Sequence, residues 1–257
     1  MTTKVRVRVT EDRVGVVEFE NGRYNFLDGD LITSIAEACE ELAAQRNARS
    51  ILLCSSGRHF CAGADFSGAE ESFFEEAEYG RHPYDAMVRM LSLDLPVVAS
   101  VQGAAIGGGL GLALVCDFRF ASPESRFAAP FARLGMHQGS AISVTLPLVV
   151  GQQNAKDLMF TGRRVSGEEA FSLGLVDRII PASQLSEGAY EYAAAIAANA
   201  PITLRSIRRT LRGDLINRAK EAVKHEIAIQ ALERTTFDHR EGVAADLARR
   251  LPAFLDR

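Results

Sequence analysis

The sequence predicts an α/β fold, with a core of short, largely parallel strands that alternate with helices and a helical C-terminal region. Two observations predict the core: short apolar runs recur along the chain, and helical patterns lie between them. A third predicts the second part, because the pattern is helical from about residue 195 to the end. We therefore expect a core that carries the functional site over 1–195 and a helical region over 196–257.

The individual elements follow from local patterns. Residues 4–20 alternate with period two and predict two strands joined by a turn near Glu11 and Asp12, whereas 31–45 has apolar residues at helical spacing. Residues 68–90 are acidic and aromatic and contain Gly80 and Pro83, which indicates a mobile or partly helical loop. The other predicted elements are buried strands at 50–56, 96–103 and 118–122 and amphipathic helices at 201–215, 216–235 and 242–257.

Composition narrows the class of protein. The 257 residues are 47% hydrophobic and 24% charged with a net charge of −4, which is typical of a globular protein and argues against nucleic-acid binding. The four cysteines form no CxxC pair and no metal-ligand spacing, so we expect no metal and a reduced interior. The N-terminus has no apolar signal-peptide core, and no 18-residue apolar stretch is free of charges or breakers. We expect a cytoplasmic protein that does not enter membranes.

Three adjacent glycines interrupt a stretch otherwise suited to burial. Gly107, Gly108 and Gly109 would each weaken a helix or strand by roughly 1 kcal/mol relative to alanine. A second loop with small residues, GRHFCAGADFSG at 57–68, also follows an apolar run. Backbone N–H groups from two such loops can converge on one oxygen as an oxyanion hole, and the helix expected after Gly108 would add its positive dipole end. The alternative is that the glycines only allow tight packing between strand and helix.

Longer motifs make the chain recognisable. HFCAGADFSG at 59–68, PVVASVQGAAIGGGLGLALVCDFRFASPESRFAAPFARLG at 96–135 and LMFTGRRVSGEEAFSLGLVDRIIP at 158–181 resemble the enoyl-CoA hydratase/isomerase (crotonase) superfamily, in the family's order. The resemblance implies a spiral of ββα units followed by a helical trimerisation region. It also implies a homotrimer or dimer of trimers that binds acyl-CoA thioesters and stabilises an enolate-type oxyanion. No separate cofactor is implied, because coenzyme A is part of the substrate.

The resemblance also assigns residues by position. The oxyanion-hole N–H groups are expected to be those of Ala64 and Gly108. Ala62 matches the residue whose backbone meets the adenine of CoA, and Asp65 is expected to order its loop. Arg23 and Arg58 are candidates for CoA phosphates, and Arg249 and Arg250 match a C-terminal basic pair. The substrate-binding residues that we expect are Gly22, Arg23, Tyr24, Ala62, Asp65, Phe66, Gly107, Gly111, Pro130, Phe131 and Leu134.

The chain departs from the family where a hydratase has its two catalytic glutamates. Gly111 stands at one of these positions and Phe131 at the other, and neither residue can transfer a proton. The turn GMHQGSA at 135–141, where some relatives have a carboxylate, has none. His137 in this turn is the candidate proton carrier and thus an expected catalytic residue beside Ala64 and Gly108. The alternative is that its ring points away into helix packing or a subunit interface. The alternative carriers lie in 68–90, namely Glu70, Glu71, Glu75, Glu76, Glu78, His82, Tyr84 and Asp85.

These observations leave several functions open. The first is an acyl-CoA lyase or isomerase of this family, active in fatty-acid-type metabolism, that is not a standard hydratase. An apolar pocket of Phe66, Ile106, Leu110, Phe131 and Leu134 would suit decarboxylation of a malonyl-type CoA thioester, because loss of CO2 generates the enolate directly. The others are a non-catalytic acyl-CoA-binding homologue and an enzyme for a ketone without CoA.

Overall fold

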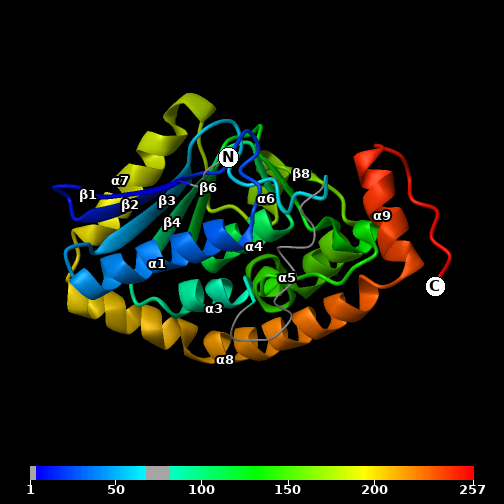
Figure 1. Ribbon diagram of the computed structural model, residues 1–257. Coiled ribbons are helices and arrows are strands. Elements are labelled where there is room, and N and C mark those ends of the chain that lie inside the picture. The colour runs from blue at the N-terminus through cyan, green and yellow to red at the C-terminus, as the bar shows by residue number, and fades with distance from the viewer. Residues whose placement is uncertain (1–3, 68–81) are drawn as a thin grey trace.

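The computed structural model describes residues 4–67 and 82–257, which form two sheets, a set of covering helices and a C-terminal helical arm (Figure 1). In chain order the strands are β1 (Lys4–Val9), β2 (Val14–Glu20), β3 (Ser50–Ser55), β4 (Val97–Val101), β5 (Ala104–Ile106), β6 (Phe118–Ala121), β7 (Arg126–Ala128), β8 (Val165–Ser166) and β9 (Arg178–Ile179). The α-helices are α1 (Gly29–Gln45), α3 (Asp85–Ser92), α4 (Gly108–Val115), α5 (Ile142–Thr161), α6 (Gly167–Ser172), α7 (Leu185–Ala197), α8 (Pro201–Glu233) and α9 (Phe237–Leu247), and the 3-10 helices are η1 (Pro130–Leu134) and η2 (Ala182–Gln184).

The larger sheet has the strand order β1-β2-β3-β4-β6-β9. Only β1 and β2 pair antiparallel, and the remaining pairs are parallel. Both faces of the parallel part are covered, so β4 is buried at every position and β3 at its first four. The edge strand β1 is mostly exposed and carries Lys4, Arg6 and Arg8, charges of a kind that protect a sheet edge from pairing with other chains.

The smaller sheet has the order β5-β7-β8, and its strands β5 and β7 follow directly on β4 and β6 of the larger sheet. The chain runs from β4 into β5 and then into α4, and from β6 into β7 and then into η1. The chain after β3 follows the same course, from the larger sheet to the edge of the smaller one. There Cys61 forms a parallel bridge with Ala105 of β5. The repeated ββα unit confirms the predicted α/β spiral, and it brings the loops after Cys61, β5 and β7 to the same side of the small sheet.

Helices cover the larger sheet on both faces (Figure 1). Helix α7 packs on one face through Leu185, Ala189 and Ala193. Helix α1 packs on the other face, α3 packs on α1 and α4, and α5 packs on α4 and η1. Helix α8 runs along the outside of α3 and α5. Two helices were expected over 201–235, but α8 is one helix of 33 residues. A side chain at Gly213 would meet no neighbour, so this glycine lies at an open position on the helix and does not interrupt it.

Residues 68–90 were expected to be a mobile or partly helical loop. The structure describes the second half of this segment, where Asp85–Ser92 is the helix α3, and 68–81 lie outside the described residues. The four cysteines are free thiols, and burial raises the pKa of Cys61 and of Cys116 to about 12. Among the described helices, none combines the length and apolar character needed to cross a lipid bilayer.

Candidate active site

The first half of the site is the peptide between Gly63 and Ala64. Gly63 has φ +92°, and a Cβ there would lie 2.9 Å from the carbonyl oxygen of Ile106, so only glycine lets the loop approach β5 this closely. The carbonyl of Gly63 accepts a hydrogen bond from the N–H of Leu27 at 2.8 Å. Because a trans peptide places its C=O and N–H on opposite sides, the N–H of Ala64 points away from Leu27.

The second half is the peptide between Gly107 and Gly108 at the start of α4. Gly107 has φ +54°, and its carbonyl accepts a hydrogen bond from the N–H of Gly111 at 3.1 Å. The N–H of Gly108 therefore points out of the N-terminus of the helix, where the positive end of the helix dipole lies. A Cβ on Gly109 would lie 2.3 Å from the carbonyl oxygen of Cys61, so this glycine lets the first loop lie directly on the helix.

The structure thus brings Ala64 and Gly108 to two loops in direct contact. Cys61 pairs with β5 through two hydrogen bonds, from its N–H to the carbonyl of Ala104 at 2.9 Å and to its carbonyl from the N–H of Ile106 at 3.1 Å. Within residues 4–67 and 82–257, neither the N–H of Ala64 nor that of Gly108 donates a hydrogen bond. Two free donors on adjacent loops, one of them at a helix N-terminus, form an arrangement suited to bind an oxyanion.

Gly111 and Phe131, which stand at the two positions expected for hydratase glutamates, are apolar and closely packed. A Cβ on Gly111 would lie 2.4 Å from Cβ of Ser140, so the backbone as it stands has no space for any side chain at position 111. Phe131 is buried, and its ring tip lies 3.8 Å from the position of a Cβ on Gly107. Pro130, which begins η1, and Leu134, which ends it, frame this ring.

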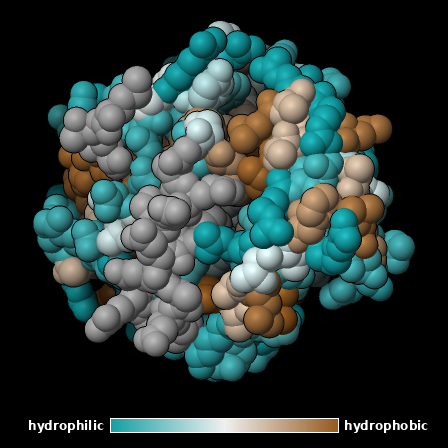
Figure 2. Space-filling view, turned by 45° about the vertical axis from the view of Figure 1, so that its right-hand side comes forward, coloured by the Kyte–Doolittle hydropathy of each residue, from teal (hydrophilic) through white to brown (hydrophobic). Residues whose placement is uncertain are grey.

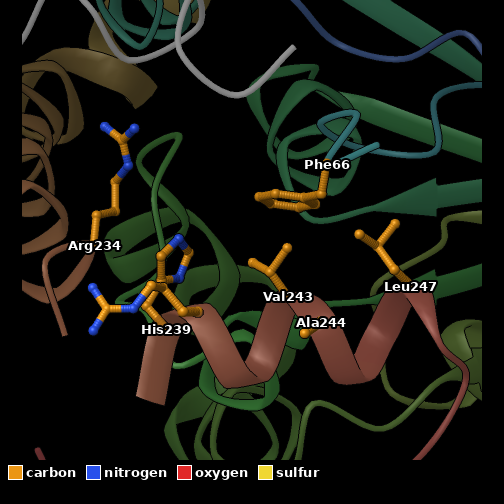
Figure 3. Close-up of a pocket in the computed structure, with 7 residues that line it drawn as sticks. Phe66, Arg234, His239, Val243, Ala244 and Leu247 are labelled. Atoms are coloured by element: carbon orange, nitrogen blue, oxygen red, sulfur yellow. The ribbon is translucent and has the colours of Figure 1, made fainter. Parts of the chain in front are cut away.

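A cavity of about 350 Å3 lies beside Phe66. Figure 3 shows the ring of Phe66 above Val243 and Leu247 of α9, with Arg234 and His239 at the other end. Helix α9 is held against η1, because Nδ1 of His239 donates to the carbonyl of Leu134 at 2.8 Å. The full lining is Phe66, Arg234, His239, Arg240, Val243, Ala244 and Leu247, so the cavity borders the site without including Ala64 or Gly108.

The N-terminal loop predicted to contact CoA lies next to the Ala64 loop. The N–H of Ala62 donates to the carbonyl of Tyr24 at 3.1 Å, and Gly22 has φ +66° at the start of the loop. Asn25 holds the two loops together, because its Nδ2 donates to the carbonyls of Ser56 and His59, each at 2.8 Å. Sequence analysis did not identify Asn25, although a polar residue within an otherwise apolar Tyr-Asn-Phe-Leu run is a recognisable signal.

Positive charge collects at the outer edge of these loops. Arg23 lies over the ring of Tyr24 at 5.4 Å, and this ring stacks on His59 with centroids 5.9 Å apart. Partial burial lowers the pKa of His59, and the nearby guanidinium groups of Arg58 and Arg23 lower it further. Neither arginine forms an ion pair within the part of the chain that the structure describes, so both charges are available to an anion.

Asp65 is placed to order its own loop. Its Oδ1 accepts hydrogen bonds from the N–H of Ser67 at 2.9 Å and from the hydroxyl of Ser67 at 2.6 Å. Such a turn fixes the backbone directly after Ala64, which is the role expected for this residue.

His137 lies in the turn between η1 and α5, and this turn packs against α8; no contact between its ring and Gly108 is found among the described residues. Its N–H donates to Glu233 at 2.5 Å, and its carbonyl accepts from Gln230 at 2.7 Å. The ring is perpendicular to that of His225, with centroids 5.6 Å apart, and Nδ1 donates to the carbonyl of Gln138. The glutamates considered as alternative carriers, Glu70, Glu71, Glu75, Glu76 and Glu78, lie outside the described residues.

A buried carboxylate that sequence analysis missed supports this region. Glu226 of α8 is fully buried and accepts from the N–H of Ala141 at 2.9 Å and from the N–H and hydroxyl of Ser143 at 3.1 and 2.5 Å. The side chain of Glu226, although it belongs to α8, therefore caps the N-terminus of α5. Burial raises the pKa of Glu226 to about 7, although the three hydrogen bonds oppose the shift.

This pKa predicts how stability depends on pH. Between the unfolded value of 4.5 and about 7, the folded chain holds a proton on Glu226 that the unfolded chain releases. The free energy of unfolding is therefore expected to fall as pH rises through this range, by about 3 kcal/mol for this group. Urea unfolding at pH 5 and 7.5 measures the change. In Glu226→Gln, the free energy of unfolding is expected to change less between pH 5 and 7.5. The same change in the variant as in the unchanged chain would show that Glu226 is not the group responsible.

Comparison with known proteins identifies the family to which this fold belongs. The family model described as enoyl-CoA hydratase/isomerase matches residues 10–257. A putative enoyl-CoA hydratase of Thermus thermophilus is 34% identical over 96% of this chain and all of its own length. The crystal structure of an enoyl-CoA hydratase/isomerase from Pseudoalteromonas atlantica has a TM-score of 0.87 and 31% identity, covering 98% of this chain and 99% of its own. That of an enoyl-CoA hydratase from Mycobacterium avium subsp. paratuberculosis has a TM-score of 0.86 and 26% identity, covering 98% of each chain. The chain therefore belongs to the enoyl-CoA hydratase/isomerase family.

Proposed function

We propose that the chain binds the carbonyl oxygen of an acyl-CoA thioester between the N–H groups of Ala64 and Gly108 and stabilises the enolate that forms there. The observation that carries this proposal is the pair of free N–H donors on two loops in contact. Such donors act most strongly where water is excluded, and each contributes roughly 3 kcal/mol to lowering a barrier. Membership in an acyl-CoA enzyme family supports the assignment of the thioester.

We propose further that the reaction is not hydration of an enoyl-CoA by a pair of glutamates. Gly111 and Phe131 supply no carboxylate, and Ser140 fills the space beside Gly111. An apolar pocket favours a reaction in which the enolate forms with little proton transfer. In decarboxylation of a malonyl-type thioester, the C2–C3 bond breaks, CO2 leaves and the electron pair passes into the enolate, which then takes a proton at C2 from water. Isomerisation and a non-catalytic acyl-CoA-binding role are the alternatives.

Arg23 and Arg58 are proposed to hold the phosphates of CoA. Both are exposed, and both influence His59. Arg58 lies on the loop that leads to Ala62 and Ala64, and Arg23 lies on the N-terminal loop that contacts it through Tyr24. A guanidinium group makes paired hydrogen bonds with phosphate oxygens, which suits this role.

A homotrimer or dimer of trimers is proposed as the assembly. Figure 2 shows apolar surface in several separate patches among polar residues on the face that carries the C-terminal helix. Large side chains that are more than two-thirds exposed include Phe160, Ile202, Leu211 and Leu251. Exposed apolar area of this kind is typical of surfaces that subunits cover.

The proposal is tested with a panel of thioesters. Crotonyl-CoA is followed by its enoyl-thioester absorbance, and malonyl- and methylmalonyl-CoA are followed by mass spectrometry. We expect no hydration of crotonyl-CoA and loss of CO2 from a malonyl-type thioester. Rapid hydration would contradict the reading of Gly111 and Phe131. Tight binding of every thioester without turnover would instead support the non-catalytic role.

A further inference from the structure

A buried hydroxyl lies without a partner directly beside the proposed oxyanion site. Ser140 is fully buried, and within the described residues its Oγ makes no hydrogen bond. This oxygen lies 3.6 Å from the position of a Cβ on Gly108 and 3.3 Å from that of a Cβ on Gly111. The hydroxyl therefore faces the first turn of α4, next to the N–H that is proposed to bind the thioester oxygen.

The position of Ser140 is imposed by its surroundings. Ser140 and Ala141 have φ values of +63° and +60°, a left-handed backbone that non-glycine residues adopt at a cost. Glu226 holds the N–H of Ala141 from α8, and the ring of Tyr84 packs so closely on Gly139 that a Cβ there would lie 2.3 Å from it. A strained backbone that is fixed from two sides and leaves a hydroxyl unpaired is a feature that functional sites share.

Tyr84 is engaged with another side chain. The Tyr84 hydroxyl donates to Oε1 of Gln230 at 3.2 Å, and Nε2 of Gln230 in turn donates to the carbonyl of His137. Burial raises the pKa of Tyr84, and the side chains of Gln230 and Ser140 oppose this rise. Within the described residues, no hydrogen-bond partner lies within reach of the Ser140 hydroxyl itself.

We propose that the Ser140 hydroxyl donates a hydrogen bond to an oxygen on C3 of the acyl group, and that it thereby selects thioesters with a carboxylate or carbonyl at this carbon. The inference rests on the proposed binding of the thioester oxygen at Gly108. In such a thioester, the oxygen on C3 lies close to the thioester oxygen. Two nearby oxygens of the ligand would therefore meet two nearby donors of the protein, the Ser140 hydroxyl and the N–H of Gly108. Leu27, which lies beside the same position of Gly108 as the hydroxyl, is buried and apolar, and so are Leu110 and Phe131. A site of this kind rejects a ligand without the oxygen, because the hydroxyl then stays unpaired.

The test compares thioesters that differ at C3. Dissociation constants of acetoacetyl-CoA, malonyl-CoA and butyryl-CoA are measured by titration calorimetry for the unchanged chain and for Ser140→Gly, which removes the hydroxyl and accepts the left-handed backbone. If the protein turns malonyl-CoA over, its dissociation constant cannot be titrated, and KM and kcat are measured instead for the unchanged chain and for the variant. Ser140→Ala is the second variant, and a thermal melt checks that both fold.

We expect each variant to lose about 10- to 100-fold in affinity for the oxygen-bearing thioester that the unchanged chain prefers, and less than about twofold for butyryl-CoA. Preference of the unchanged chain for malonyl-CoA would indicate that Ser140 binds a C3 carboxylate, and preference for acetoacetyl-CoA would indicate a C3 carbonyl. Tyr84→Phe is the matched control, because it keeps the ring on Gly139 and is expected to leave the discrimination unchanged.

Two results would overturn the inference. Equal losses for all three thioesters, or none, would mean that Ser140 contacts water or only supports the fold. An equal loss of discrimination in Tyr84→Phe would mean that the hydroxyl serves Tyr84. If the unchanged chain binds no CoA thioester, the proposed function fails as well, whereas binding of butyryl-CoA without discrimination contradicts this inference alone.

Discussion

Replacing Gly108 by proline is expected to lower kcat about 100- to 1,000-fold relative to replacing it by alanine. Proline has no N–H, so it removes one of the two proposed oxyanion donors. It is otherwise suited to this position, because Gly108 is the first residue of α4 and proline is favoured there. Both variants place a Cβ 2.7 Å from Cδ2 of Leu27, the end of a flexible side chain, so the steric change at this carbon is matched.

The substrate for this comparison is the thioester that the panel shows to turn over. A second readout is independent of turnover, namely the infrared carbonyl stretch of bound butyryl-CoA. The shift to lower frequency that two N–H donors cause is expected in Gly108→Ala and reduced in Gly108→Pro. Equal kcat values and equal carbonyl frequencies in the two variants would show that the N–H of Gly108 does not bind the thioester oxygen.

Replacing Asp117 by alanine is expected to lower the free energy of unfolding by about 3–5 kcal/mol. Asp117 follows α4, and its carboxylate binds two arginines of α8, with Nε of Arg208 at 2.8 Å and Nη2 of Arg212 at 2.7 Å. It also accepts from the N–H of Val97 at 2.8 Å. Burial alone would raise the pKa of Asp117, but the two guanidinium groups more than offset this and lower it. Without the carboxylate, two buried cations lose their partner.

Urea unfolding at fixed protein concentration measures this loss. The matched control is Asp214→Ala, which also removes an aspartate paired with an arginine of α8. Asp214 is 84% exposed and lies 4.0 Å from Arg218, so its removal is expected to change the free energy by less than about 1 kcal/mol. Similar values for the two variants would contradict the anchoring role of Asp117.

The parts of the fold that follow local patterns could be predicted from the sequence. Alternation over 4–20 predicted the hairpin of β1 and β2, since a period of two residues reports directly on the two faces of a strand. The division of 201–235 into two helices was wrong, because Gly213 lowers helix propensity while the contacts of Arg208 and Arg212 with Asp117 hold the helix in place. Local propensity does not include contacts between residues about 90 positions apart.

The same reason explains what was missed at the candidate site. The glycines and the Ala64 loop could be identified because a group of small residues directly after an apolar run is visible in the local sequence. The close approach of Gly109 to Cys61 that requires one of these glycines is a long-range contact. Glu226 and Ala141 are 85 residues apart, and only the docking of α8 brings them together. His137 was chosen for its place in a turn, but the direction of its ring depends on Gln230, Glu233 and His225 of that helix. The roles of Ala64, Gly108 and His137 stay predictions.

The contact between Gly111 and Ser140 has a consequence for how the chemistry of this scaffold can change over evolutionary time. A glutamate that arises at position 111 in the present background meets Cβ of Ser140, so this first step towards two-glutamate hydration destabilises the fold before it brings any activity. Loss of the Ser140 side chain removes the closest clash but also removes the hydroxyl proposed to select the substrate. Positions 111 and 140 are therefore epistatic, and a lineage can gain the second activity only by changing both of them in addition to Phe131.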